Sequence, residues 1–196
     1  SVNYVESHDN MTLVDKITAS VKDAKPADIA QLSQLASSIA FLSQGMPFMQ
    51  AGQEFLRSKG GDTNSYKSSD LVNSLKWSTQ STNASTVKYF KGLIALRKAH
   101  PAFRMETTDQ VKKNLKFLSS PEGTIAYSIN GSAVKDSAAT LVVVHNASTS
   151  PQSITLPKSG SWSVLVESGR AGTTVLRKVN GNTIMVEARS TLVVTQ

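Results

Sequence analysis

Short apolar runs alternate with an amphipathic segment along the first fifty residues. Residues 2–5 form a β-prone run that ends at the polar string of residues 6–10, and residues 46–50 form a second apolar run. Between these runs, apolar residues recur at three- and four-residue spacing from Ile29 to Leu42, which predicts an amphipathic helix that stops near Gly45. Strand, helix and strand in this order are typical of a parallel sheet with buried strands.

Helix signals also occur before and after this helix. Residues 11–21 can form a short helix, and Pro26 and Asp28 supply the chemistry of a helix start. A polar connection then extends over residues 57–84, where roughly 2–6 residues would be usual, and long connections in compact domains often carry function. The last helix of this half is predicted to end before Pro101.

The pattern changes at about residue 105, where short alternating or apolar runs begin and predict an antiparallel β-sandwich. The predicted strands are residues 115–118, 124–129, 140–145, 153–156, 162–166, 174–179, 183–187 and 191–195. Asn130-Gly131 and Asn180-Gly181 are favoured turn dipeptides between strands. We therefore expect two domains, residues 1–104 and 105–196.

Composition excludes several classes of protein. Hydrophobic residues make up 39% and charged residues 18%, so a packed globular chain is expected. The net charge is +7, but the densest basic group, Lys112, Lys113 and Lys116, has no interleaved aromatic residues, which argues against a nucleic-acid-binding surface. The absence of cysteine excludes disulfides and thiolate chemistry. No apolar run reaches the ~18 residues of a membrane span, and the first residues lack the features of a signal peptide, so the chain is expected to begin inside a fold.

Four segments resemble the α-amylase superfamily. Residues 3–10, Asn-Tyr-Val-Glu-Ser-His-Asp-Asn, resemble the strand-seven motif of its barrels, and the Tyr-Val-Glu-Ser form is similar to that of type I pullulanases. Residues 42–57 resemble the strand-eight region, and residues 64–73 resemble a pullulanase-type loop. Residues 96–103 resemble the last barrel helix before a C-terminal β domain. Beyond about residue 105 only the architecture is similar.

The resemblance implies a fold and an activity. The fold is α/β plus all-β, with the last two strand–helix units of a (β/α)₈ barrel followed by an antiparallel β-sandwich. The activity is that of a retaining glycoside hydrolase that cleaves α-1,6 linkages in pullulan and branched α-glucans. Such an enzyme in a bacterium is expected outside the cell or on its surface, with the cytoplasm as the alternative.

The same resemblance assigns the third carboxylate of this family to Asp9, as a stabiliser of the oxocarbenium-like transition state, and a sugar contact to His8. Residues with such roles lie at the carboxyl ends of barrel strands. The alternative for His8-Asp9 is a loop pair that caps the next helix. Asn10 is equally a substrate contact or a helix cap.

Polar groups elsewhere are candidates of the same kind. The resemblance places Asn64, Tyr66, Asp70 and Asn73 along a branched-glucan cleft, with loop ordering as their alternative role. Gln53 and Glu54 suit either hydrogen bonding within the barrel or sugar contact. Structural roles are favoured for His100 and His145, and a core position is favoured for Trp162.

The chain lacks the rest of such a barrel. About 100 residues precede the predicted sandwich, where a complete barrel needs about 250, and the nucleophile and general acid have no counterpart. The isolated chain is therefore expected to be inactive, and its expected partners are the α-glucan substrate and the N-terminal remainder of the barrel. No cofactor is required, and a calcium site is compatible with the sequence but has no signature in it. The alternatives are a non-catalytic glucan-binding or assembly module and a fragment of an α-1,4-cleaving superfamily member.

Overall fold

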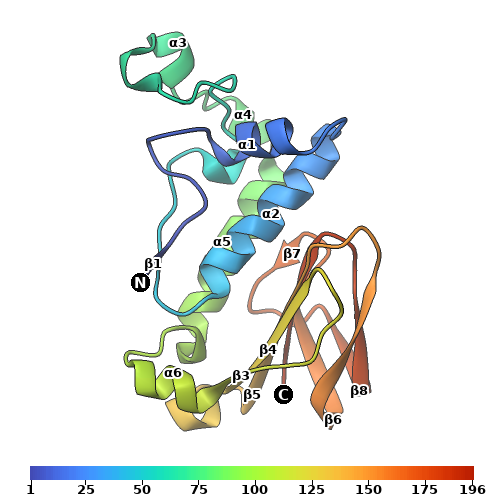
Figure 1. Ribbon diagram of the computed structural model, residues 1–196. Helices are drawn as coiled ribbons and strands as arrows, with labels where there is room; N and C mark the ends of the chain where they lie inside the picture. The colour runs from blue at the N-terminus through green and yellow to red at the C-terminus, as the bar shows by residue number, and fades with distance from the viewer.

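The computed structural model describes residues 1–196, with a helical half that packs against an antiparallel sheet (Figure 1). The helical half contains β1 (Val2–Asn3), α1 (Leu13–Ser20), α2 (Pro26–Leu42), β2 (Met46–Pro47), η1 (Gln53–Phe55), η2 (Ser65–Lys67), α3 (Asp70–Asn73), α4 (Thr79–Thr82), α5 (Ala84–Ala99) and η3 (Pro101–Phe103). The sheet half contains α6 (Thr108–Asn114), β3 (Leu115–Phe117), β4 (Thr124–Asn130), η4 (Ser132–Val134), β5 (Thr140–Asn146), β6 (Gln152–Glu167), β7 (Arg170–Ala171), β8 (Arg177–Val186) and β9 (Ser190–Thr195). No helix is both long enough and apolar enough to cross a bilayer.

The two strands of the helical half pair in parallel, as the strand–helix–strand pattern predicts. Val2 lies opposite Met46, and Asn3 lies opposite Pro47. The prediction that these strands are buried is wrong, because the side chains of Val2, Tyr4, Met46 and Phe48 are all exposed. Apolar side chains remain exposed here because no third strand joins the pair and no layer of the chain covers it.

The two long helices, α2 and α5, begin and end where the sequence chemistry predicts, whereas the short helices α3, α4 and α6 are not predicted by it. The backbone N–H of Lys25 donates to Asp28 Oδ2 at 3.0 Å, which satisfies one free amide at the start of α2. The end of α2 is held by Arg97 of α5, whose Nη1 donates to the carbonyl oxygens of Phe41 at 2.8 Å and Ser43 at 2.9 Å. α5 itself ends at Ala99, directly before the His-Pro pair.

The sheet is antiparallel throughout, with strand order β3-β4-β5-β9-β6-β7 and with β8 paired to β6. β6 and β8 each join two of the predicted strands, so the prediction of eight separate strands is wrong. The Asn180-Gly181 pair lies inside β8, opposite residues 160–161 of β6 at a register shift, and does not form a hairpin turn. Gly181 has a φ of 112°, which a glycine adopts without strain.

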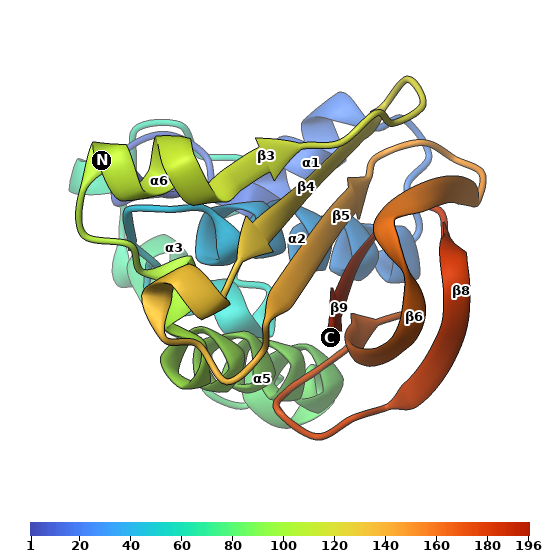
Figure 2. The same ribbon diagram turned by 90° about the horizontal axis from the view of Figure 1, so that it is seen from below.

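The long strands β6 and β8 curl, so that one continuous sheet forms a sandwich-like fold (Figure 2). Its inner face encloses a core around the fully buried Trp162, as predicted for that residue. The other members of this core are Ala126, Val142, Val144, Ile154, Leu156, Val164, Ile184, Val186, Leu192 and Val194. The all-β part of the chain is therefore an antiparallel sheet that buries side chains against itself.

A second core joins the other face of the sheet to the helices. Phe41 and Leu42 of α2 and Phe90 of α5 pack there with residues of β4, β5, β6 and β9. α5 approaches the sheet closely at Gly92, where an added Cβ would lie 2.0 Å from the carbonyl oxygen of Ala171. The predicted domain boundary at residue 104 stays a prediction, and a single hydrophobic core extends across it.

Candidate functional site

The polar string after β1 forms an exposed corner, which we define as residues 8–10. The side chains of His8 and Asp9 are 86% and 81% exposed, and His8 Nε2 lies 3.5 Å from Asp9 Oδ2. Asn10 has a φ of 65°, in the left-handed region that asparagine tolerates, and its Oδ1 accepts the N–H of Met11 at 2.8 Å. The corner therefore presents an imidazole and a carboxylate to solvent.

Other residues cap the helix that follows the corner. Thr12 Oγ1 accepts the N–H of Asp15 at 3.2 Å, and the Glu6 carboxylate accepts the N–H of Leu13. His8, Asp9 and Asn10 make no such bond to α1. The capping alternative for these residues is therefore wrong, because Thr12 is the N-cap of α1, and the side chains of His8 and Asp9 bond to no other element.

Two buried carboxyl groups, Glu6 and Asp15, lie before and after the corner in the sequence. Burial tends to raise the pKa of Asp15, but hydrogen bonds from the Ser58 hydroxyl at 2.5 Å and the Lys59 N–H at 2.8 Å outweigh it, so the pKa is lowered. For Glu6, burial dominates and raises the pKa, against the opposing effects of the Leu13 N–H and the Arg57 cation. Asp15 therefore carries a negative charge that is satisfied from the polar loop.

The loop of residues 64–73 presents some of its predicted site residues and uses another internally. Tyr66 is exposed, with Lys67 Nζ 5.3 Å from its ring centroid. Asn64 and Asp70 are also exposed. Asn73 Nδ2 instead donates to the carbonyl oxygens of Ser65 at 2.7 Å and Ser68 at 3.0 Å, which is the loop-ordering role. A sugar contact by any of the four stays a prediction.

A buried lysine links the corner to this loop. Lys59 Nζ donates to the carbonyl oxygen of His8 at 3.2 Å and to Ser65 Oγ at 2.7 Å. Sequence reasoning missed Lys59, Asp15 and Glu6. The sequence carries no pattern for them, because their partners lie up to 51 positions away along the chain.

The remaining candidates take structural positions. Gln53 Nε2 donates to Ser37 Oγ at 2.9 Å, and Glu54 Oε2 accepts the N–H of Gly52 at 3.0 Å, so both hydrogen-bond within the fold. His100 Nδ1 lies 2.7 Å from a carboxylate oxygen of Asp136, which also accepts two backbone N–H groups. These positions agree with the structural roles predicted for His100 and with the hydrogen-bonding alternative for Gln53 and Glu54.

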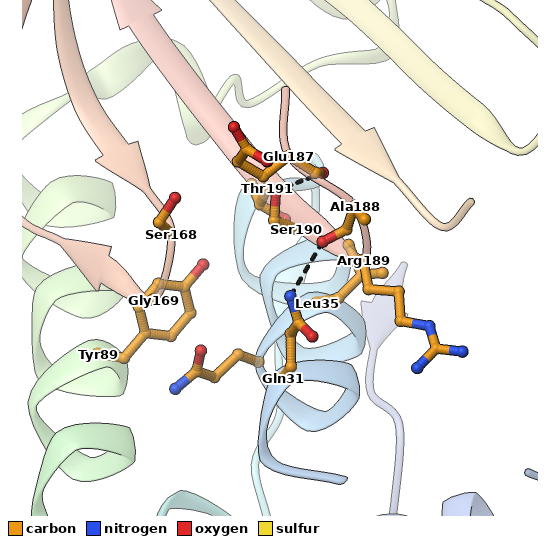
Figure 3. A pocket seen from close by; sticks show the side chains of 11 residues that line it. Gln31, Leu35, Tyr89, Ser168, Gly169, Glu187, Ala188, Arg189, Ser190 and Thr191 are labelled. Carbon is orange, nitrogen blue, oxygen red and sulfur yellow. Dashed lines mark hydrogen bonds between the residues drawn. The ribbon is translucent and has the colours of Figure 1, made fainter. Parts of the chain in front are cut away.

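Two larger cavities lie outside the corner. One, of about 410 Å³, lies beside the polar loop and is lined by residues that include Arg57, Lys59 and Leu71. The other, of about 460 Å³, lies between α2, α5 and the turns of the sheet (Figure 3). There Gln31 Nε2 donates to the carbonyl oxygen of Ala188 at 3.0 Å. No predicted site residue lines this second cavity, and no three His, Asp or Glu side chains lie where they could share a metal ion.

Known proteins match both halves of the chain. The family model described as "Pullulanase, all-beta domain" matches residues 111–170. The pullulanase of Bacillus subtilis strain 168 is 38% identical over 167 residues, which is 85% of this chain and 23% of that protein. The structure of the pullulanase from Bacillus acidopullulyticus superposes with a TM-score of 0.95 at 43% identity, covering 100% of this chain and 24% of that chain.

A further solved structure is the type I pullulanase of Bacillus subtilis strain 168 complexed with maltose. It has a TM-score of 0.92 at 34% identity and covers 100% of this chain and 27% of that chain. This chain thus spans about a quarter of the length of the relatives that it matches.

The fold and the matched relatives place the chain in the class of proteins that includes pullulanases and isoamylases. Within this class the chain is homologous to type I pullulanases, and it corresponds to a C-terminal portion that includes their all-β domain.

Proposed function

We propose that the chain supplies the last two strand–helix units of a (β/α)₈ catalytic barrel, together with the following β domain, to a retaining hydrolase of α-1,6 linkages in pullulan and branched α-glucans. One observation carries the proposal. His8 and Asp9 are exposed beyond the carboxyl end of a parallel strand and cap no helix, and the main-chain carbonyl of His8 accepts a hydrogen bond from the buried Lys59. Catalytic groups of barrel enzymes occupy this place in the fold.

The chemistry assigned to the corner follows from the transition state. Hydrolysis with retention passes through an oxocarbenium-like species, so a fixed carboxylate beside the sugar ring stabilises the developing positive charge. Asp9 supplies that carboxylate and His8 donates a hydrogen bond to the same sugar. The nucleophile and the general acid come from the remainder of the barrel.

The proposed substrate contacts come from both the corner and the loop of residues 64–73. Asn10 at the corner and Asn64, Tyr66 and Asp70 on the loop present amide, phenol and carboxylate groups, which suit sugar hydroxyls and sugar rings. Relatives have been crystallised with maltose and with maltohexaose and α-cyclodextrin, which supports an α-glucan as the ligand.

The exposed strand pair supports a position for the proposed remainder of the barrel. Val2, Tyr4, Met46 and Phe48 leave apolar area in water, and a cavity of about 330 Å³ separates β1 from Ile39 of α2. Burial of such area is favourable at about 25 cal/mol per Å². A neighbouring strand and helix from the N-terminal remainder would cover both features, so this remainder is the proposed protein partner.

The test is gain of activity when the parts are combined. The isolated chain is expected to release no sugar from pullulan, because Asp9 alone cannot perform a double displacement. The chain fused to the remainder of its parent barrel, hereafter the joined protein, is expected to hydrolyse pullulan. Release of reducing ends from pullulan measures both. Turnover by the isolated chain that persists after removal of contaminating amylase, or a folded but inactive joined protein, would contradict the proposal.

A further inference from the structure

Lys59 is a buried cation without a carboxylate partner. Its residue is 6% exposed, and no acidic oxygen forms a salt bridge with its Nζ. An ammonium group taken out of water is costly unless it is hydrogen-bonded. The two oxygens that satisfy it are the main-chain carbonyl of His8 at 3.2 Å and the hydroxyl of Ser65 at 2.7 Å. The ammonium group of Lys59 therefore hydrogen-bonds to both the corner and the loop.

The other end of Lys59 is fixed to α1. Its backbone N–H donates to Asp15 Oδ2 at 2.8 Å, and the neighbouring Ser58 hydroxyl donates to Asp15 Oδ1 at 2.5 Å. Asp15 is buried, and hydrogen bonds hold it in its charged form. These bonds fix the backbone from which the Lys59 side chain extends to the corner and the loop.

The contact with Ser65 extends into the loop. Ser65 is buried, and its carbonyl oxygen accepts from Asn73 Nδ2 at 2.7 Å. Arg57 in turn donates to the carbonyl oxygen of Asn73. The ammonium of Lys59 thus lies between the backbone that carries Asp9 and the hydrogen-bonded loop that carries Tyr66.

We propose that Lys59 is a positioning residue, which fixes the His8–Asp9 peptide relative to the loop of residues 64–73 and thereby aligns the Asp9 carboxylate with the sugar. The link between residues 8–10 and the loop is given by the hydrogen bonds of Lys59 Nζ. Its catalytic consequence rests on the proposed function. Misplacement of a reacting group by about 1 Å can cost on the order of 10²-fold in rate. A partial loss of alignment is expected to lower kcat by about tenfold.

The coupling is tested first in the 196-residue chain, by ¹⁵N relaxation of the backbone. Lys59→Met is expected to reduce the order parameters of residues 8–10 and 64–73 toward the values below about 0.6 of flexible backbone. The matched variant Ser65→Ala keeps the donor to His8, so it is expected to loosen residues 64–73 alone. Unchanged order parameters at residues 8–10 in Lys59→Met overturn the inference. If that variant does not fold, Lys59→Gln replaces it, because its shorter amide does not reach His8.

The catalytic consequence is tested in the joined protein with pullulan. Lys59→Met is expected to lower kcat about tenfold with KM changed less than about twofold, whereas Ser65→Ala is expected to raise KM with little change in kcat. If residues 8–10 become mobile in Lys59→Met but its kcat equals that of the parent, the positioning role is overturned. If the parental joined protein is itself inactive while the relaxation result holds, it is the proposed function that has failed.

Discussion

Replacement of Asp9 by Asn in the joined protein is expected to lower kcat on pullulan by about 10²–10³-fold, with little change in KM. The side chain is exposed at the corner and takes no part in capping α1, so its loss leaves the fold intact. Its charge matters most where positive charge develops on the sugar, and removal of one electrostatic group from such a site typically costs on the order of 10²–10³-fold in kcat.

Tyr66→Ala is the comparison for this experiment. Tyr66 is exposed on the loop, and stacking on a sugar would be felt equally by the bound substrate and the transition state. Loss of such uniform binding raises KM and leaves kcat unchanged. Steady-state kinetics of both variants, each shown to be folded by circular dichroism, separate the two roles. A near-parental kcat for Asp9→Asn would contradict the assignment of residues 8–10 as the active-site corner.

The second large effect concerns His145 and the pH dependence of folding stability. His145 of β5 is buried, with Thr191 Oγ1 2.9 Å from its Nδ1 and no hydrogen-bond partner for its Nε2. Burial lowers the pKa of His145 to about 3 in the folded chain, against about 6.5 when unfolded. Between these values the unfolded chain binds a proton that the folded chain does not.

The sign of the effect follows from this difference. The free energy of unfolding is expected to fall as the pH drops below about 6.5, by up to about 1.4 kcal/mol per pH unit, which amounts to about 2 kcal/mol between pH 6.5 and 4.5. Urea unfolding at a series of pH values measures the slope. His145→Gln is expected to remove this part of the slope, and His8→Gln, at the exposed corner, is expected to retain it. Identical slopes for the parent and His145→Gln would show that His145 is not held neutral by burial.

The sequence predicts the two long helices better than the strands. α2 and α5 follow from apolar spacing that matches the helical repeat and from proline and glycine at their ends. β6 and β8 each contain polar, exposed residues in the middle, so they appear as two strands apiece until their pairing across Gly160 and Gly181 is known. The short β7 has only two residues and leaves no pattern at all.

Only some residues of the candidate site can be predicted from the sequence. The resemblance to known barrels identified the exposed groups of the corner and loop, since those groups lie in contiguous sequence motifs. The buried residues Lys59 and Asp15 were missed because they are defined by contacts between segments 43 to 51 positions apart. The apolar runs of β1 and β2 predict buried strands. Burial needs neighbouring strands on the sheet, and this chain provides none beyond the pair.

The linkage that the joined protein cleaves is the most direct test of the central claim, that this chain completes the active site of an α-1,6-glucan hydrolase. Pullulan contains both α-1,6 and α-1,4 linkages, and their anomeric protons give separate NMR signals. Incubation of pullulan with the joined protein is expected to remove the α-1,6 signal and leave the α-1,4 signal intact. Loss of the α-1,4 signal with retention of the α-1,6 signal would contradict the account and would favour an α-1,4-cleaving enzyme.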